Sequence, residues 1–259
     1  MTAIDDPVPA SELRYRSPGR ERADTVVGDR ITRFDRAERW LHWANATLVL
    51  ILIVTGSVMY IDVFTAMVGR RVLVETIHLY AGLALPFPFL AVLLGRWNRS
   101  FRRDARRLGR FTPDDWAWFR KAQRKGGRLR VGKFNAGQKV NAILVAGALP
   151  VMLATGSVMK WHDPFSDGWR TGATLVHDVG YVSLVLLVAG HIRKAVKDPV
   201  SLAAMRRGRP VSLRWAREHH PRWHAEVLGI ADEIVPTEPE PTTPGSTEAS
   251  ASTDRSPGA

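Results

Sequence analysis

The apolar residues of this chain are gathered into four stretches that polar segments separate, and this pattern predicts four membrane-spanning helices. The predicted spans are residues 44–61, 77–95, 141–159 and 174–192. Each is close to the roughly 20 residues that a helix needs to cross about 30 Å of hydrocarbon. Pro86 and Pro88 are expected to kink the second span, and Pro150 to bend the third. We therefore expect an all-α protein, an integral membrane four-helix bundle.

Both ends of the chain lack this apolar pattern. Residues 1–30 are polar and are predicted to form a disordered cytoplasmic arm; because they contain no apolar core, no cleavable signal peptide is expected. Residues 231–259 are rich in Pro, Thr, Ser and Glu, and are predicted to form a disordered cytoplasmic tail. The membrane domain is therefore expected to occupy residues 31–230.

The distribution of positive charge predicts the topology. The net charge is +12, and Lys and Arg number eight in residues 1–43, fifteen in residues 96–139 and ten in residues 193–259. The two other connections hold only Arg70, Arg71, Lys160 and Arg170. Because cytoplasmic loops of membrane proteins are enriched in Lys and Arg, the alternation places both termini in the cytoplasm. Nucleic-acid binding would explain the total charge but not its alternation, so we expect a multi-pass protein of the cytoplasmic membrane and no nucleic-acid partner.

The absence of cysteine limits the redox chemistry that the chain can support. No residue is available for a disulfide, a cysteine-ligated iron–sulfur cluster or covalent haem attachment. Any redox centre must use other ligands, and histidine is the obvious candidate.

Four histidines lie within or at the rims of the apolar stretches, where an ionisable group indicates a functional site. They are His42, His78, His177 and His191. His177 and His191 are 14 residues apart, which is about 21 Å along a helix and nearly on one face of it. Depth then pairs His42 with His191 on the cytoplasmic side, and His78 with His177 on the outer side. Two imidazoles can ligate one haem iron, and a six-coordinate iron carries electrons rather than activating oxygen.

Several features near these histidines remain open to more than one interpretation. Gly82, Gly180 and Gly190 would let a flat macrocycle approach the backbone, but small residues also let membrane helices pack closely, which is the favoured interpretation. The segment TGSVM occurs at residues 55–59 and 155–159. Coincidence of membrane composition is favoured over a distant duplication of a helical hairpin.

Other polar residues are less informative. Asp178 is a second ionisable group in the fourth span, and either a role beside the ligand or one on a proton path is open. For His162, His219, His220 and His224 we expect surface or partner contacts. A metal-ion transporter is the main alternative to haem binding, but its ligands would converge near the midplane of the membrane.

The segment KFNAGQK, residues 133–139, precedes the third span. Asn135 and Gln138 offer neutral hydrogen-bonding groups and Gly137 permits close approach, so the segment is expected to cap the following helix. It also lies at the depth of the His42 and His191 pair. A quinone headgroup would need neutral donors near an electron source.

These segments together resemble the cytochrome b (gamma) subunit of membrane-bound formate dehydrogenase over about residues 31–229. The motifs that carry the resemblance are RFDRAERWLHW, IHLYAG, VGKFNAGQK, LVHDVG, AGHIRK and SLRWAREHHPRWHAE. The resemblance implies two haem b groups, one ligated by His42 and His191 and the other by His78 and His177. It also implies a menaquinone site formed by Asn135, Gly137, Gln138 and His191.

The resemblance implies partners as well: an iron–sulfur (beta) subunit and a catalytic (alpha) subunit with molybdopterin or tungstopterin, on which formate is oxidised. We therefore expect a subunit of a formate:quinone oxidoreductase that passes electrons through two bis-histidine haems to menaquinone, and that has no catalytic residue for formate oxidation itself. The alternatives are an anchor of a related complex, such as a hydrogenase or a polysulfide or thiosulfate reductase, and a non-redox metal transporter.

Overall fold

The computed structural model describes residues 23–95, 98–120 and 129–230 of the chain. Most of the predicted N-terminal arm (residues 1–22) and all of the predicted tail (residues 231–259) lie outside the described residues. As predicted, the described chain is mostly helical and contains four helices that are long and apolar enough to cross a membrane. They are α1 (Arg36–Tyr60), α3 with α4 (Arg71–Ala84 and Pro86–Leu94), α8 (Ala136–Lys160) and α9 (Asp167–Lys197).

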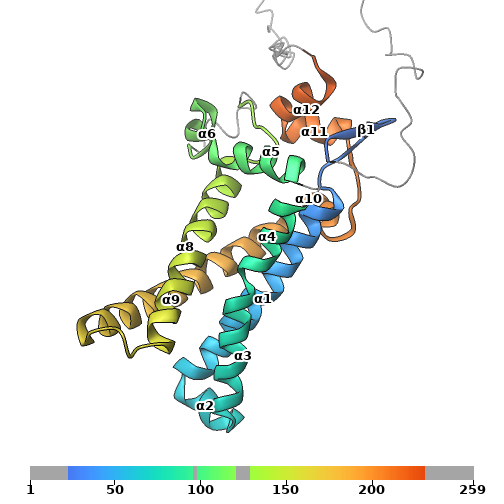
Figure 1. The fold of residues 1–259 in the computed structure, drawn as a ribbon. Helices are drawn as coiled ribbons and strands as arrows, with labels where there is room; N and C mark the ends of the chain where they lie inside the picture. Colours follow the sequence, from blue (N-terminus) through green and yellow to red (C-terminus); the bar gives the residue numbers. More distant parts are fainter. Residues whose placement is uncertain (1–22, 96–97, 121–128, 231–259) are drawn as a thin grey trace, which may run out of the picture.

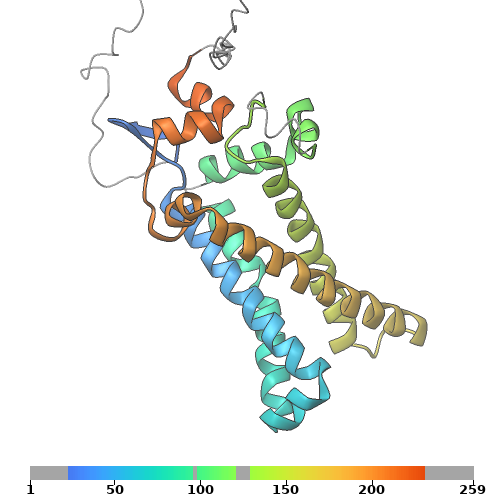
Figure 2. The same ribbon diagram turned by 180° about the vertical axis from the view of Figure 1, so that it is seen from behind.

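The four long helices form two antiparallel hairpins (Figure 1). The short helix α2 (Asp62–Val68) connects α1 to α3, and α1 packs against both α3 and α4. Helices α8 and α9 pack together where they are joined and separate toward their other ends, as both views show (Figure 1 and Figure 2). Helix α1 also contacts α9, and a hydrogen bond of 2.8 Å between Ser57 and Tyr181 joins these two helices.

Local sequence explains where these helices begin and break. Asp35 caps α1 and Asn135 caps α8, each through a reciprocal capping box with the residue three positions on. The second span is interrupted at the prolines where a kink was predicted: α3 ends at Ala84 and α4 starts at Pro86, whose ring nitrogen has no proton for a helical hydrogen bond. Helix α8, in contrast, continues through Pro150.

The outer surface of the four long helices is strongly apolar. Leu186 is 69% exposed and Val179 is 59% exposed on α9, and the other long helices expose further large apolar side chains. An apolar surface of this extent is typical of a membrane or interaction surface rather than of a water-exposed helix. The exposed faces of these helices are therefore suited to contact with lipid.

The prediction of an all-α fold is wrong in one detail. Strands β1 (Thr25–Val27), β2 (Arg30–Thr32) and β3 (Val211–Ser212) form an antiparallel sheet in the order β1-β2-β3. The sequence did not indicate it because strands of two or three residues are too short to show an alternating pattern. Residues 23–30, predicted to belong to the N-terminal arm, are therefore folded.

This sheet is part of a polar cap at one end of the long helices. We use "the cap" for residues 23–34, 129–134 and 198–229 together with α5 (Asn98–Gly109). These ranges contain β1 to β3, α10 (Pro199–Arg207), α11 (Leu213–His219) and α12 (Pro221–Leu228). Its apolar centre consists of Ile31, Phe34, Ala204, Val211, Ala216 and Trp223. The cap lies beside the start of α1 and the end of α9, which is the end that carries His42 and His191 (Figure 1).

Candidate functional site

The structure brings the four membrane histidines together as two separate pairs. His42 on α1 and His191 on α9 have ring centroids 6.1 Å apart, with an angle of 45° between the rings. His78 on α3 and His177 on α9 have centroids 6.3 Å apart, with an angle of 63°. Both pairs therefore share α9, and the 14-residue spacing separates them by about 21 Å along its axis.

The spacing within each pair fits a single metal ion between two imidazoles. A metal–imidazole bond is about 2 Å long, as in zinc sites, and the centroid lies about 1 Å behind the nitrogen, so the centroids should be roughly 6 Å apart. Among the described residues, no group of three or more His, Cys, Asp or Glu side chains can hold a metal ion. Two protein ligands per site suit an iron whose other positions a macrocycle fills, and they do not suit the four-ligand site of a structural zinc ion.

Glycines let His78 and His177 lie close to the neighbouring helices. A Cβ atom added at Gly156 would lie 3.2 Å from Cε1 of His177, and one at Gly56 would lie 3.6 Å from Cε1 of His78. The glycines singled out in the sequence, Gly82, Gly180 and Gly190, do not lie against a histidine ring. Gly180 faces the sulfur of Met152, which supports the packing interpretation, and nothing lies within 4 Å of a Cβ at Gly190.

The two pairs differ in their polar surroundings. Nδ1 of His78 lies 2.8 Å from Oγ1 of Thr55, and Nδ1 of His177 lies 3.0 Å from Oγ1 of Thr155. In the part of the chain that the structure describes, the buried Nδ1 of His42 has no hydrogen-bond partner. Sequence reasoning missed both threonines, although the repeated TGSVM segment that contains them was the available signal.

The residues predicted to form a quinone site lie at the start of α8. The side-chain oxygen of Asn135 accepts from the backbone N–H of Gln138, and that of Gln138 accepts from the backbone N–H of Asn135, each at 3.0 Å. The expected capping role is therefore confirmed. A Cβ at Gly137 would lie 3.1 Å from Trp118, the last residue of α6 (Pro113–Trp118), so glycine makes room for this indole ring.

Trp118 connects this segment to the helix that carries His191. The ammonium group of Lys194 on α9 lies 5.7 Å from the centroid of the Trp118 ring, and Lys194 follows His191 by three residues. An ammonium group at this distance from an indole face is attracted to it. The ring is therefore held between Gly137 on α8 and the His191 end of α9.

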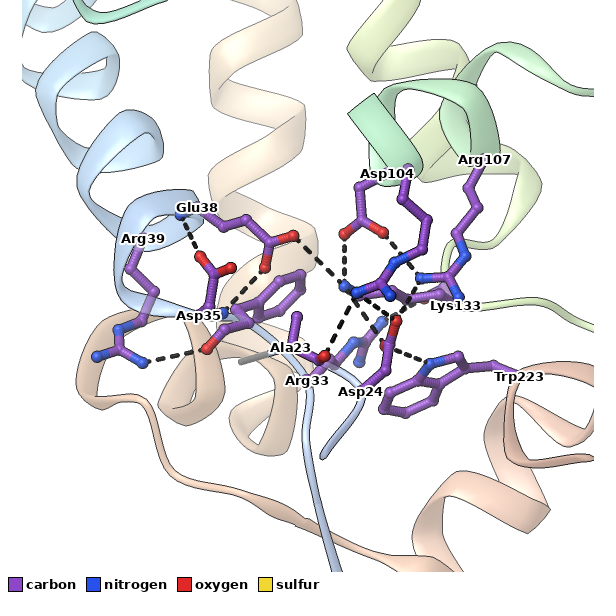
Figure 3. Close-up of polar contacts among 12 residues, drawn as sticks. Ala23, Asp24, Arg33, Asp35, Glu38, Arg39, Asp104, Arg107, Lys133 and Trp223 are labelled. Atoms are coloured by element: carbon purple, nitrogen blue, oxygen red, sulfur yellow. Dashed lines mark hydrogen bonds and ion pairs between the residues drawn. The ribbon is translucent and has the colours of Figure 1, made fainter. Parts of the chain in front are cut away.

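A cluster of buried charges fixes the segment that leads into α8 (Figure 3). The side chain of Lys133 is fully buried and pairs with Asp104, and carboxyl oxygens of Glu38 and Asp24 lie 3.7 Å and 3.8 Å from its ammonium group. Burial raises the pKa of Glu38 to about 8, although Lys133 opposes the shift. Arg107 contacts both Asp24 and Asp104 at 2.8 Å. Four segments that are distant in sequence therefore meet at Lys133.

Burial and the neighbouring charges shift the pKa values of ionisable groups in the cap. Burial alone would raise the pKa of Asp24, but the positive charges of Lys133 and Arg107 outweigh it, and the net shift is downward. Burial lowers the pKa of Arg33 to about 10, although Asp198 and Asp104 oppose the shift. Arg33 donates to the Lys133 carbonyl at 2.9 Å and lies against the rings of Phe34 and Trp215.

The expectation of surface contacts for the remaining histidines is wrong for His220. This residue is only 4% exposed, and its Nδ1 lies 2.7 Å from the Gly132 carbonyl oxygen. Burial, with a smaller contribution from Arg33, lowers its pKa to about 3. His162 pairs with Asp163 at the surface, and His219 stacks on Trp215. His220 therefore has a structural role in the cap.

Long apolar helices that bring imidazoles together as two pairs, at the two ends of one helix, define a membrane cytochrome of the b type. Comparison with known families agrees with this class. The chain belongs to the prokaryotic cytochrome b561 family, whose model matches residues 33–208. This family implies haem b as the cofactor.

Individual relatives are consistent with the resemblance seen in the sequence. The formate dehydrogenase cytochrome b556(fdo) subunit of Escherichia coli (strain K12) is 25% identical over 217 residues, which are 80% of this chain and 95% of the relative. The formate dehydrogenase cytochrome b556 subunit of Haemophilus influenzae is 28% identical over 79% of this chain and 87% of its own length. The nitrate-inducible cytochrome b556(Fdn) subunit of E. coli K12 is 34% identical over 101 residues, 46% of that protein.

Proposed function

We propose that this chain is the di-haem b membrane subunit of a formate dehydrogenase complex, and that it passes electrons from an iron–sulfur subunit to menaquinone. The observation that carries the proposal is the pairing of His42 with His191 and of His78 with His177, at two levels of one helix. The names of the relatives support formate dehydrogenase as the complex. A second subunit with molybdopterin or tungstopterin would oxidise formate.

Each histidine pair would hold one haem b, which supplies one-electron transfer when it is bound. The chain contributes the ligands and the apolar surroundings, and its helices keep the two sites at fixed depths. Since both pairs include a residue of α9, this single helix sets the distance between the two sites. The pair of His78 and His177 would face the iron–sulfur partner on the outer side, and the other pair would lie near the cytoplasm, where both termini are proposed to be.

The quinone site is proposed at Asn135, Gly137, Gln138 and His191. The capping box uses the side-chain oxygen of each amide, so the NH₂ groups of Asn135 and Gln138 can donate to a quinone oxygen. Trp118 adds an aromatic ring between Gly137 and the His191 end of α9. A headgroup bound there would lie beside the pair of His42 and His191, with protons taken from the cytoplasmic side.

One experiment tests the haem assignment. The purified full-length chain should contain about two haem b groups, and the reduced protein should show low-spin b-type bands. The substitution His78→Ala should remove one haem and leave the other, because the two pairs share no ligand. His162→Ala, which changes an exposed histidine paired with Asp163, is the matched control and should retain both.

Two kinds of result would contradict the proposal, and a third would invalidate the measurement. A colourless wild-type protein would exclude haem binding altogether. Loss of both haems in the His78→Ala protein, or of neither, would contradict the pairing. Loss of a haem in the His162→Ala protein would show that the measurement reports general instability rather than ligation.

A further inference from the structure

We infer that the repeated TGSVM segment is a positioning device, in which Thr55 and Thr155 orient the two outer histidines as ligands and increase their electron donation. The inference rests on the proposed function, since it assigns His78 and His177 to a haem. It gives the two copies of the segment, residues 55–59 and 155–159, the same task on different helices. Thr55 on α1 serves His78 on α3, and Thr155 on α8 serves His177 on α9.

The hydrogen bonds of each threonine determine which histidine nitrogen carries the proton. The hydroxyl of Thr55 donates to the carbonyl of Ile51 at 2.7 Å, and that of Thr155 donates to the carbonyl of Val151 at 2.8 Å. A hydroxyl has one proton and two lone pairs. With its proton directed to its own helix, each threonine faces the imidazole as an acceptor, so Nδ1 of the histidine is the donor.

This arrangement leaves Nε2 as the unprotonated nitrogen of both outer histidines. Nδ1 and Cε1 of each ring lie against the threonine and glycine of the repeat, so Nε2 is the nitrogen available to a metal. The glycines are part of the same device, because a Cβ at Gly156 would lie 3.2 Å from the His177 ring and force it away. The pair Thr-Gly therefore supplies both a hydrogen-bond acceptor and the room to reach it.

A hydrogen bond from the distal N–H of a ligating imidazole raises the basicity of the ligand. A more basic ligand stabilises ferric over ferrous iron, and hence lowers the midpoint potential of the haem. The inner pair lacks this support at His42, whose buried Nδ1 has no partner among the described residues. The threonines therefore lower the outer potential relative to the inner one, which favours electron transfer inward.

The test is a redox titration of the purified full-length protein with Thr55→Val and Thr155→Val, in which valine keeps the shape and removes the hydroxyl. Each variant should raise the midpoint potential of the outer haem and leave that of the inner haem unchanged; the His78→Ala protein identifies the inner one. A tenfold loss of ferric preference corresponds to about 59 mV for one electron. Thr55→Ser and Thr155→Ser should retain the wild-type potential, because serine keeps the hydroxyl.

Matched controls are Thr76→Val on α3 and Thr174→Val on α9. Their hydroxyls bond the carbonyls of Val72 and Arg170 in their own helices. Both controls should leave the two potentials unchanged. The inference is also supported if a Thr→Val variant loses the outer haem while its serine counterpart keeps it. Loss of the hydrogen-bond partner of a ligating histidine typically weakens metal binding by about 10–100-fold.

An unchanged outer potential in both valine variants would overturn the inference while leaving the proposed function intact. Equal shifts of the two haems, or serine variants that behave like the valine variants, would overturn it as well. A wild-type protein without an outer haem would overturn both the inference and the proposed function, so the two failures are distinguishable.

Discussion

Replacing Lys133 by methionine should open the cap, because the substitution removes a buried ammonium group that lies against the carboxyl groups of Asp24, Glu38 and Asp104. The Lys133 side chain is 0% exposed and pairs with Asp104, with Glu38 at 3.7 Å and Asp24 at 3.8 Å. Methionine has a similar length and no charge. The change is therefore mainly a loss of charge and only secondarily a loss of packing.

The structure sets the size of the effect. Removing one partner of a buried ion pair costs about 3–5 kcal/mol, because the other charge remains buried and uncompensated. Arg107 still contacts Asp24 and Asp104, and Glu38 still accepts from the backbone N–H of Asp35. We therefore expect the lower end of that range, about 3 kcal/mol, or roughly a 100-fold change in the opening equilibrium of the cap.

The assay is amide hydrogen exchange of the detergent-solubilised protein, followed over residues 213–228. Protection there should fall about 100-fold in the Lys133→Met protein, while α3 and α9 keep theirs. The control is Arg214→Met, which breaks a surface pair with Glu218 whose arginine side chain is 89% exposed. Such pairs contribute about 0–1 kcal/mol. Equal exchange in the two variants would refute the role assigned to Lys133.

Two further predictions concern pH and the proposed quinone site. The pKa of His220 is about 3 in the folded cap against an ordinary value of 6.5, so the unfolded chain binds the proton first. His220 therefore contributes its full share of cap stability above about pH 6.5, and that share is lost as the pH falls toward 3. The lowered pKa of Asp24 acts in the same direction below about pH 3.8, whereas burial raises the pKa of Glu38 to about 8, so Glu38 acts in the opposite direction between pH 8 and 4.5. Urea unfolding between pH 7 and 4 should show that the wild type loses more stability than the His220→Asn protein as the pH falls; an equal pH dependence in the two proteins would contradict the assignment. Gly137→Ala should displace the Trp118 ring and weaken binding of a quinone analogue by about tenfold, because overpacking typically costs about 1–3 kcal/mol. The control is Gly147→Ala in the same helix. It should bind the analogue normally, because its added Cβ has no neighbour within 4 Å.

The membrane part of the fold was predictable because its signals are local or follow directly from helix geometry. Apolar length alone identifies four helices, although α1 and α9 each extend several residues beyond the predicted spans. The depth of each histidine within its span predicted which ones meet, and the structure brings those pairs together. The capping box of Asn135 and Gln138 was equally local, since its two partners lie three residues apart.

The cap was not predictable because its determinants are far apart in the sequence. In the sequence, Lys133 is one of fifteen basic residues in a loop predicted to be cytoplasmic. Only the fold brings it to Asp24, Glu38 and Asp104. The sequence predicted His220 to lie at the surface, but the fold packs it against Trp215 and Trp223 and brings the carbonyl of Gly132, 88 residues away, to its Nδ1. Thr55 and Thr155 were visible as a repeat, but their function depends on a ring from the neighbouring helix.

The charge cluster also links the two halves of the proposed inner site. Glu38 precedes His42 by four residues and so lies on the same side of α1, while Lys133 precedes Asn135 by two. The 3.7 Å contact between Glu38 and Lys133 joins α1, which carries the proposed haem ligand His42, to the segment that begins the proposed quinone site. The histidine pairs themselves are held by α1, α3 and α9. The Lys133→Met substitution should therefore weaken the binding of a quinone analogue and leave both haems bound. Loss of the inner haem at the same time would show that the cap positions His42 as well.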